Sequence, residues 1–135
     1  MNDQELLRYS KQVMLPQVDI EGQQKIIDST MLIIGMGGLG SPAAFYLAGA
    51  GVGHLIIADF DQVELSNLQR QIIYRTADIG SDKVDTARAR LLELNPNIKV
   101  TIANELLHTG NLAALVKDVD IVLDGTDNFE SRFEI

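Results

Sequence analysis

The sequence predicts an α/β protein with a doubly wound, mainly parallel Rossmann-like sheet, and three observations lead to this prediction. From residue 29 onward, short apolar runs alternate with amphipathic segments of helical length, as in repeated βαβ units. The run Leu32-Ile-Ile-Gly-Met-Gly-Gly-Leu-Gly40 is an apolar strand that passes directly into a GxGxxG loop. Asp59 closes the next apolar run, about twenty residues on, where such folds hold a ribose.

Residues 1–28 are expected to form a helical arm. One helix is predicted from Asn2 or Asp3 to about Met14, and Pro16 ends it. A second, shorter helix is expected from about Asp19 to Asp28. Each helix has one apolar side and is short, so we expect the arm to pack on the main domain or on a partner chain.

Four buried parallel strands are predicted in residues 29–135, because their residues are apolar on successive positions. Right-handed crossovers would connect them, and the simplest strand order is 3-2-1-4. The expected strands are Met31–Ile34, Leu55–Ala58, Ile98–Ala103 and Ile121–Leu123.

Three helices are expected between these strands. The first is predicted to begin with Ser41 as its N-cap and Pro42 at its first position. Residues 128–135 begin a further amphipathic helix, so we expect 29–135 to be a nucleotide-binding domain truncated at its C-terminus. The expected helices are Ser41 to about Gly49, Asp82 to about Leu94, and Asn111–Lys117.

The composition limits the possible functions. A length of 135 residues suits one domain, and a net charge of −8 argues against a nucleic-acid partner. The chain has no cysteine, so disulfides, thiolate metal sites and a cysteine nucleophile are excluded. The polar, acidic start is unlike a secretory leader, and no apolar run has membrane-spanning length, so a cytoplasmic protein is expected.

The glycine loop suits phosphate binding. Gly35 would permit the tight turn, Gly37 the approach of the backbone to a phosphate, and Gly40 the packing of helix on strand. Gly38 leaves another bare backbone N–H at the start of a helix, where anions bind. A loop that binds nothing is the alternative, which the preceding apolar strand makes less favourable.

Polar and charged residues follow the second strand, where ligands bind in open α/β sheets. Asn67 and Arg70 are three residues apart and could face the same phosphates, with a solvated loop as the alternative. Asp61 follows Asp59 by two residues and either shares its side or caps the turn. Lys83, in the first turn of the long helix, opposes the helix dipole, which a phosphate partner or plain surface exposure would explain.

The end of the fourth strand carries acidic residues. Asp124 and Asp127 should lie at the same carboxyl edge as the glycine loop. Carboxylates beside a triphosphate suit Mg²⁺, which takes oxygen ligands and bridges to phosphates. Helix capping is the alternative role for Asp127.

These motifs occur together in one known family. The chain resembles the ATP-dependent adenylyltransferases of the ThiF/MoeB type, which activate ubiquitin-like sulfur-carrier proteins in thiamine and molybdopterin synthesis. The resemblance rests on Arg8-Tyr-Ser-Lys-Gln12, Gly35–Gly40, Asp59-Phe-Asp61, Ser66–Gln71, Lys83 and Asp127-Asn128.

The resemblance implies ATP and Mg²⁺ as cofactors, with Asp59 on the ribose and Asp127 on the metal. Arg70, Lys83 and Asp127 would be the catalytic residues in transfer of AMP to the carrier's C-terminal glycine, with release of pyrophosphate. A carboxylate is already ionised, so the reaction needs no general base. The implied nucleotide-binding residues are Gly35, Gly37, Gly38, Gly40, Asp59, Asp61, Ser66, Asn67, Leu68, Gln69, Arg70, Lys83, Asp127 and Asn128.

Lys11 also belongs to this expectation. In many relatives an arginine at its position reaches the neighbouring subunit's nucleotide site, whereas lysine keeps the charge without the bidentate fork. Arg8 could face phosphates or be a helix-surface charge, and the second interpretation is favoured. A homodimer is expected, because the amphipathic arm and the unpaired fourth strand both expose surface.

The chain also departs from the family. The motifs match only the first half of these enzymes. The second half, which binds the carrier and usually holds a cysteine-ligated zinc, has no counterpart in these 135 residues. Two alternatives stay open at this point. An NAD-binding dehydrogenase fragment would explain the glycine loop and Asp59 but not residues 66–70, and a non-catalytic nucleotide-binding or dimerisation module would bind without turnover.

Overall fold

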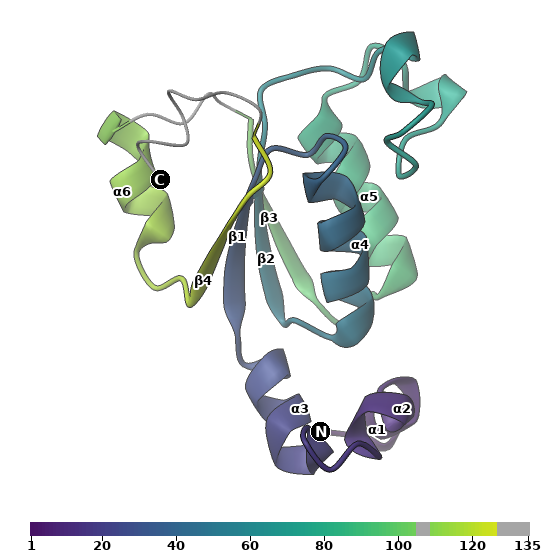
Figure 1. Ribbon diagram of the computed structural model, residues 1–135, viewed down its shortest axis with the longest axis vertical. Coiled ribbons are helices and arrows are strands. Elements are labelled where there is room, and N and C mark those ends of the chain that lie inside the picture. The colour runs from purple at the N-terminus through teal and green to yellow at the C-terminus, as the bar shows by residue number, and fades with distance from the viewer. Residues whose placement is uncertain (105–108, 127–135) are drawn as a thin grey trace.

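In the computed structural model, which describes residues 1–104 and 109–126, four parallel strands form one sheet (Figure 1). The strand order is β3-β2-β1-β4, so the predicted doubly wound sheet and its order are confirmed. The strands are β1 (Thr30–Ile34), β2 (His54–Ala58), β3 (Lys99–Ala103) and β4 (Ile121–Asp124).

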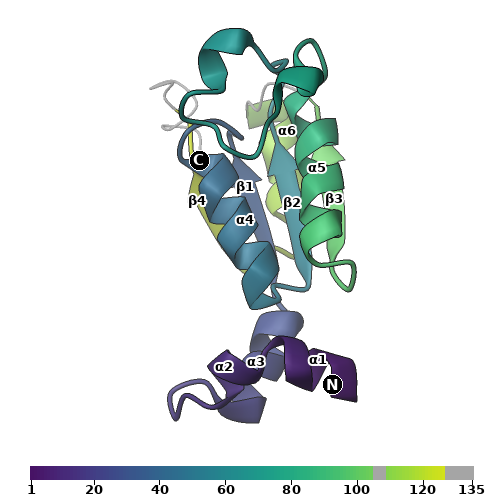
Figure 2. The same ribbon diagram turned by 90° about the vertical axis from the view of Figure 1, so that its right-hand side faces the viewer.

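Both faces of the sheet are covered, which explains why its inner strands are apolar on successive residues. The helices α4 (Gly40–Ala50) and α5 (Lys83–Leu94) cover one face, and α6 (Thr109–Val116) lies on the other (Figures 1 and 2). On β1, Ile33 belongs to the larger hydrophobic core, which includes residues of α4 and α5. Leu32 belongs to a smaller core, which includes Leu112 of α6.

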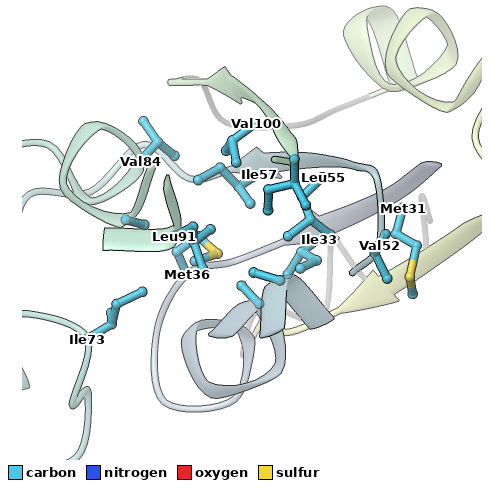
Figure 3. Packing of buried hydrophobic residues seen from close by; sticks show 14 of the residues in the cluster. Met31, Ile33, Met36, Val52, Leu55, Ile57, Ile73, Val84, Leu91 and Val100 are labelled. Carbon is cyan, nitrogen blue, oxygen red and sulfur yellow. The ribbon is translucent and has the colours of Figure 1, made fainter. Parts of the chain in front are cut away.

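The larger core lies between the sheet and the helices α4 and α5. The side chains of Ile33, Leu55 and Ile57 gather there with Leu91 of α5 (Figure 3). Each of them is fully buried, and burial of such a side chain contributes about 1.5–3 kcal/mol. This core fixes β1 and β2, and therefore the two loops that leave their carboxyl ends.

The start of α4 differs from the prediction. The helix begins at Gly40, so Ser41 is not its N-cap and Pro42 is its third residue rather than its first. The backbone N–H of Ser41 donates to the Gly37 carbonyl at 3.1 Å, and its hydroxyl donates to the same oxygen at 2.5 Å. The helix thus begins two residues earlier than predicted, and its first residue, Gly40, fits directly against the carbonyl of Gly35 because it has no side chain.

The arm consists of α1 (Asp3–Arg8), α2 (Ser10–Val13) and α3 (Asp19–Ile27). Asn2 caps α1 as predicted, but the single helix expected to about Met14 is interrupted at Tyr9. Tyr9 is 1% exposed, because the interruption turns its ring into the body of the protein. None of the helices in the described part of the chain is both long and apolar enough to cross a membrane.

A buried polar cluster attaches the arm to the opposite end of the sheet from the glycine loop (Figure 2). The side-chain amide of Asn95 donates to the phenolic oxygen of Tyr9 at 2.8 Å. Gln12 and Gln23 each donate to the carbonyl of Ala50, at 3.0 Å. The arm therefore packs on its own chain, at the amino ends of the strands.

Candidate nucleotide-binding site

The glycine loop, residues 35–40, connects the carboxyl end of β1 to α4. Gly35 has a φ of 89°, a conformation that favours glycine, and its N–H donates to the carbonyl of Ala58 at 2.8 Å. A Cβ at Gly40 would overlap the carbonyl oxygen of Gly35, so the loop closes on itself only because both residues are glycine. Gly38 is exposed, so bare backbone is presented at this edge.

Asp59 is held against this loop. One carboxylate oxygen accepts the N–H of Met36 at 2.7 Å, and the other accepts the N–H of Asp61 at 2.8 Å. Each carboxylate oxygen has two lone pairs, so Asp59 can still accept a hydrogen bond from a ligand hydroxyl. Asp61 itself is exposed beyond the strand end.

The segment 66–70 brings a cation to the glycine loop. The Arg70 guanidinium donates to the carbonyl of Ser66 at 3.1 Å, and its Cδ and Nε lie 3.8 Å from where a Cβ on Gly38 would be. Asn67 is buried, and its amide oxygen accepts the N–H of Glu64 at 3.0 Å.

Leu68 and Gln69, the other two residues of this segment, differ in burial. Gln69 is exposed, like Ser66. Leu68 is half-buried and packs against the larger core, so its side chain anchors the segment to the body of the protein.

Lys83 is the first residue of α5, and it is only 5% exposed. Its backbone N–H donates to the carbonyl of Asp61 at 3.0 Å, which ties the start of the helix to the end of β2. Within residues 1–104 and 109–126, its ammonium makes no ion pair or side-chain hydrogen bond. A lysine is rarely buried without a counter-charge, so this burial marks an unusual position.

The acidic end of β4 adjoins the loop. Asp124 pairs in register with Ile34 of β1, and one of its carboxylate oxygens accepts the N–H of Thr126 at 2.9 Å. Asp127 and Asn128, including the predicted magnesium ligand, lie outside the described residues. Among the residues described, there is no group of three or more His, Cys, Asp or Glu side chains that could hold a metal.

Lys11 is not brought to this site. It is exposed on α2, in the arm at the amino ends of the strands (Figures 1 and 2). The neighbouring Arg8 donates to the carbonyl of Leu94 at 3.1 Å, which joins the arm to the end of α5. This contact agrees with the interpretation of Arg8 as a helix-surface charge.

Two buried residues beside the loop, Gln71 and Tyr74, were not among the predicted site residues. Gln71 is 3% exposed, and its Nε2 lies 3.3 Å from where a Cβ on Gly37 would be, while its Oε1 has no hydrogen-bond partner among the described residues. Tyr74 donates its hydroxyl to the carbonyl of Met36 at 2.6 Å. Their nearness to Arg70 in the sequence was the available signal, and it does not reveal contacts with a loop more than thirty residues earlier.

Comparison with known proteins identifies the family. The ThiF family matches residues 9–135. The chain belongs to this family. Its glycine loop, Asp59, Arg70 and Lys83 all lie within the matched region.

Two relatives of this ThiF-family chain come from Escherichia coli strain K12. It is 52% identical to the sulfur carrier protein ThiS adenylyltransferase and 49% identical to the molybdopterin-synthase adenylyltransferase. Each alignment covers all of this chain and 54% of the relative. The chain thus spans about half the length of these relatives.

Solved structures share the same architecture. The E. coli tRNA N6-threonylcarbamoyladenosine dehydratase TcdA, in complex with ATP, has a TM-score of 0.91 and 26% identity over 97% of this chain and 54% of TcdA. E. coli MccB with ATP has a TM-score of 0.74 and 30% identity over 79% of this chain and 32% of MccB. Both of these solved structures contain ATP.

Proposed function

We propose that this chain is the ATP-binding part of an adenylyltransferase that activates a ubiquitin-like sulfur-carrier protein in thiamine or molybdopterin synthesis. One observation carries the proposal. Arg70 lies beside Gly38 of the glycine loop, and the buried Lys83 is tied through its backbone to Asp61 just beyond β2, in a chain that is 52% identical to a ThiS adenylyltransferase. An NAD-binding dehydrogenase is not favoured, because the named relatives are adenylyltransferases.

The described residues fit ATP. Asp59 has lone pairs for a ribose hydroxyl, and the N–H groups of Gly37 and Gly38 would bind phosphate oxygens at the start of α4. Arg70 and Lys83 would supply positive charge to the phosphates. A triphosphate would also give the ammonium of the buried residue Lys83 a counter-charge, which supports its place in the site.

The proposed reaction joins two anions. A carboxylate oxygen of the carrier's C-terminal glycine attacks the α-phosphorus, the bond from that phosphorus to the bridging oxygen breaks, and pyrophosphate leaves with the electron pair. Arg70 and Lys83 would offset the repulsion and stabilise the charge that develops on the leaving group. We propose Asp127 as the Mg²⁺ ligand, where the ion would supply further charge neutralisation for the phosphates.

The proposal extends to assembly and location. We propose residues 29–135 as the nucleotide-binding domain and 1–28 as an arm that takes part in a homodimer in the cytoplasm. Because the chain spans about half the length of its relatives, we assign it the ATP-binding step. Carrier-dependent exchange of pyrophosphate into ATP then separates an active chain from a binding module, which would bind ATP without exchange.

Titration calorimetry with ATP and Mg²⁺, in parallel with NAD, tests the proposal. We expect ATP to bind more tightly than NAD and to bind more tightly with magnesium than without it. Equal affinity for the two nucleotides, or no response to ATP, would contradict the proposed function.

The role of Lys83 is tested by Lys83→Ala. Removal of a charged hydrogen bond to phosphate should weaken ATP binding about ten- to hundredfold. Lys25→Ala is a matched control, because Lys25 lies exposed in the arm beside Glu21. An unchanged ATP affinity in Lys83→Ala would remove this lysine from the site.

A further inference from the structure

The second residue of the glycine loop, Met36, forms hydrogen bonds through both its backbone N–H and its backbone carbonyl. Met36, which is fully buried, donates its N–H to Asp59 at 2.7 Å and accepts the hydroxyl of Tyr74 at its carbonyl, at 2.6 Å. Tyr74 comes from the segment after Arg70 and is itself 4% exposed. Two segments that follow β2 therefore hold one residue that follows β1.

The hydrogen bond from Tyr74 has a geometric consequence for Gly37. The carbonyl of Met36 and the N–H of Gly37 belong to the same peptide group, and a trans peptide points these two groups in opposite directions. Residues 1–104 and 109–126 contain no cis peptide. A carbonyl drawn inward by Tyr74 therefore directs the Gly37 N–H away from Tyr74, on the outer side of the loop. Glycine imposes little conformational preference of its own, so this direction depends on the hydrogen bond.

We propose that Tyr74 is a positioning residue that holds the Gly37 N–H toward the phosphates of the bound nucleotide. This inference rests on the proposed function, because it takes the ligand to be ATP. No atom of Tyr74 needs to touch the nucleotide. Tyr74 acts through the peptide group between Met36 and Gly37, and it sets the loop before the nucleotide arrives.

The Tyr74 hydroxyl is suited to be a permanent donor. Burial raises the pKa of Tyr74 above its ordinary value, and the nearby carboxylates of Asp59 and Asp78 raise it further. The hydroxyl therefore stays protonated throughout the neutral range. Phenylalanine would fill the same space without donating, and the buried carbonyl of Met36 would lose its partner.

The test compares Tyr74→Phe with Tyr9→Phe in the full chain. Both substitutions delete one buried tyrosine hydroxyl, but Tyr9 lies in the arm, where its oxygen accepts from Asn95. We expect both variants to lose thermal stability. Only Tyr74→Phe should weaken ATP·Mg binding, by about two- to tenfold in calorimetry well below the melting temperature. Hydrogen exchange of residues 35–40 without nucleotide should also accelerate in Tyr74→Phe alone.

The outcomes separate this inference from the proposed function. If the unmodified chain does not bind ATP, the proposed function fails, and the exchange rate of residues 35–40 alone decides whether Tyr74 holds the loop. If the unmodified chain binds ATP, an unchanged affinity in Tyr74→Phe overturns the inference, as does an equal loss in both variants.

A measurement on the unmodified protein covers the case in which Tyr74→Phe does not fold. The hydroxyl proton of Tyr74 should appear in proton NMR as a slowly exchanging resonance close to the Met36 and Gly37 backbone. A hydroxyl proton that exchanges freely with water would overturn the inference.

Discussion

Gly38 and Gly40 are two residues apart in one loop, and the structure places opposite demands on them. A Cβ at Gly38 would meet Arg70 at 3.8 Å, an ordinary contact, whereas a Cβ at Gly40 would overlap the backbone of Gly35. The first glycine leaves room for a ligand, and the second allows the loop to close. The GxGxxG motif requires glycine at position 40 but not at position 38, and these two distances give the physical reason.

Alanine substitution should separate these roles. Gly40→Ala is expected to destabilise the protein by about 3 kcal/mol or more, because backbone atoms must move apart. Gly38→Ala should change the free energy of unfolding by less than about 0.5 kcal/mol. Chemical denaturation of both variants checks this, and equal stability of the two would show that the loop closes differently.

His54, at the start of β2, should make stability depend on pH. Burial lowers the pKa of His54, and the positive charge of Lys99 lowers it further. Its Nε2 lies 2.8 Å from the hydroxyl of Thr101. In the unfolded chain the imidazole takes up a proton at about pH 6.5, before the folded chain does. Stability should therefore fall as the pH drops below about 6.5 and should stop falling from this cause once the folded imidazole is also protonated.

Thermal unfolding at pH 7.5 and 5.5 measures this dependence. The unmodified chain should lose more stability over this interval than His54→Gln, because glutamine keeps a polar side chain but does not titrate. Equal losses in the two proteins would show that His54 does not contribute to the pH dependence.

The joint between the arm and α4 is a close contact between elements. Gly51 ends α4 with a φ of 94°, and a Cβ there would lie 2.6 Å from Cζ of Tyr9 and 2.9 Å from Nε2 of Gln23. The arm can approach this closely because Gly51 has no side chain. The interruption of the first helix at Tyr9 and the glycine at the end of α4 are thus parts of one contact.

Gly51→Ala and Gly80→Ala form a matched pair at the level of elements. Both glycines have a φ near 90°, but no atom lies within 4 Å of a Cβ added at Gly80. Gly80→Ala should cost about 1 kcal/mol of backbone strain. Gly51→Ala should cost about 2 kcal/mol more and loosen the arm. Denaturation, together with limited proteolysis of residues 1–28, checks both effects, and equal costs would mean that the joint is not tightly packed.

For the whole molecule, the placement of the arm decides what Lys11 can do. The arm lies at the amino ends of the strands, and the glycine loop lies at their carboxyl ends (Figure 2). Lys11 therefore does not reach the glycine loop of its own chain. Any contact of this lysine with ATP requires a second copy of the chain, which agrees with the proposed homodimer.

Mixed assemblies test this arrangement. Lys11→Ala and Lys83→Ala should each weaken ATP binding when every copy carries the substitution. A dimer that combines one copy of each should contain one site with both lysines, so calorimetry should detect about one tight ATP per dimer. Sedimentation as a monomer, or no recovery of tight binding in the mixture, would contradict the proposed role of Lys11.

Much of the architecture was readable in the linear order of residues. The four strands and their order followed from their apolar runs, which are buried on successive residues in β1 and largely in β2, and from the right-handedness of parallel crossovers. The same rules place the ends of β1 and β2 at one edge, so the approach of Arg70 to Gly38 could be anticipated. These features depend on periodicity and chirality, which act over short stretches of chain.

Packing between distant segments determined the remainder. Local patterns do not encode the contacts behind three features. These are the interruption at Tyr9, the early start of α4 at Gly40 and the hydrogen bond from Tyr74 to Met36. A hydroxyl or a glycine has the same local preference whether or not a partner lies opposite. Its role appears when the chain folds, because the free energy of a buried hydrogen bond or close contact depends on which distant atom fills the neighbouring space.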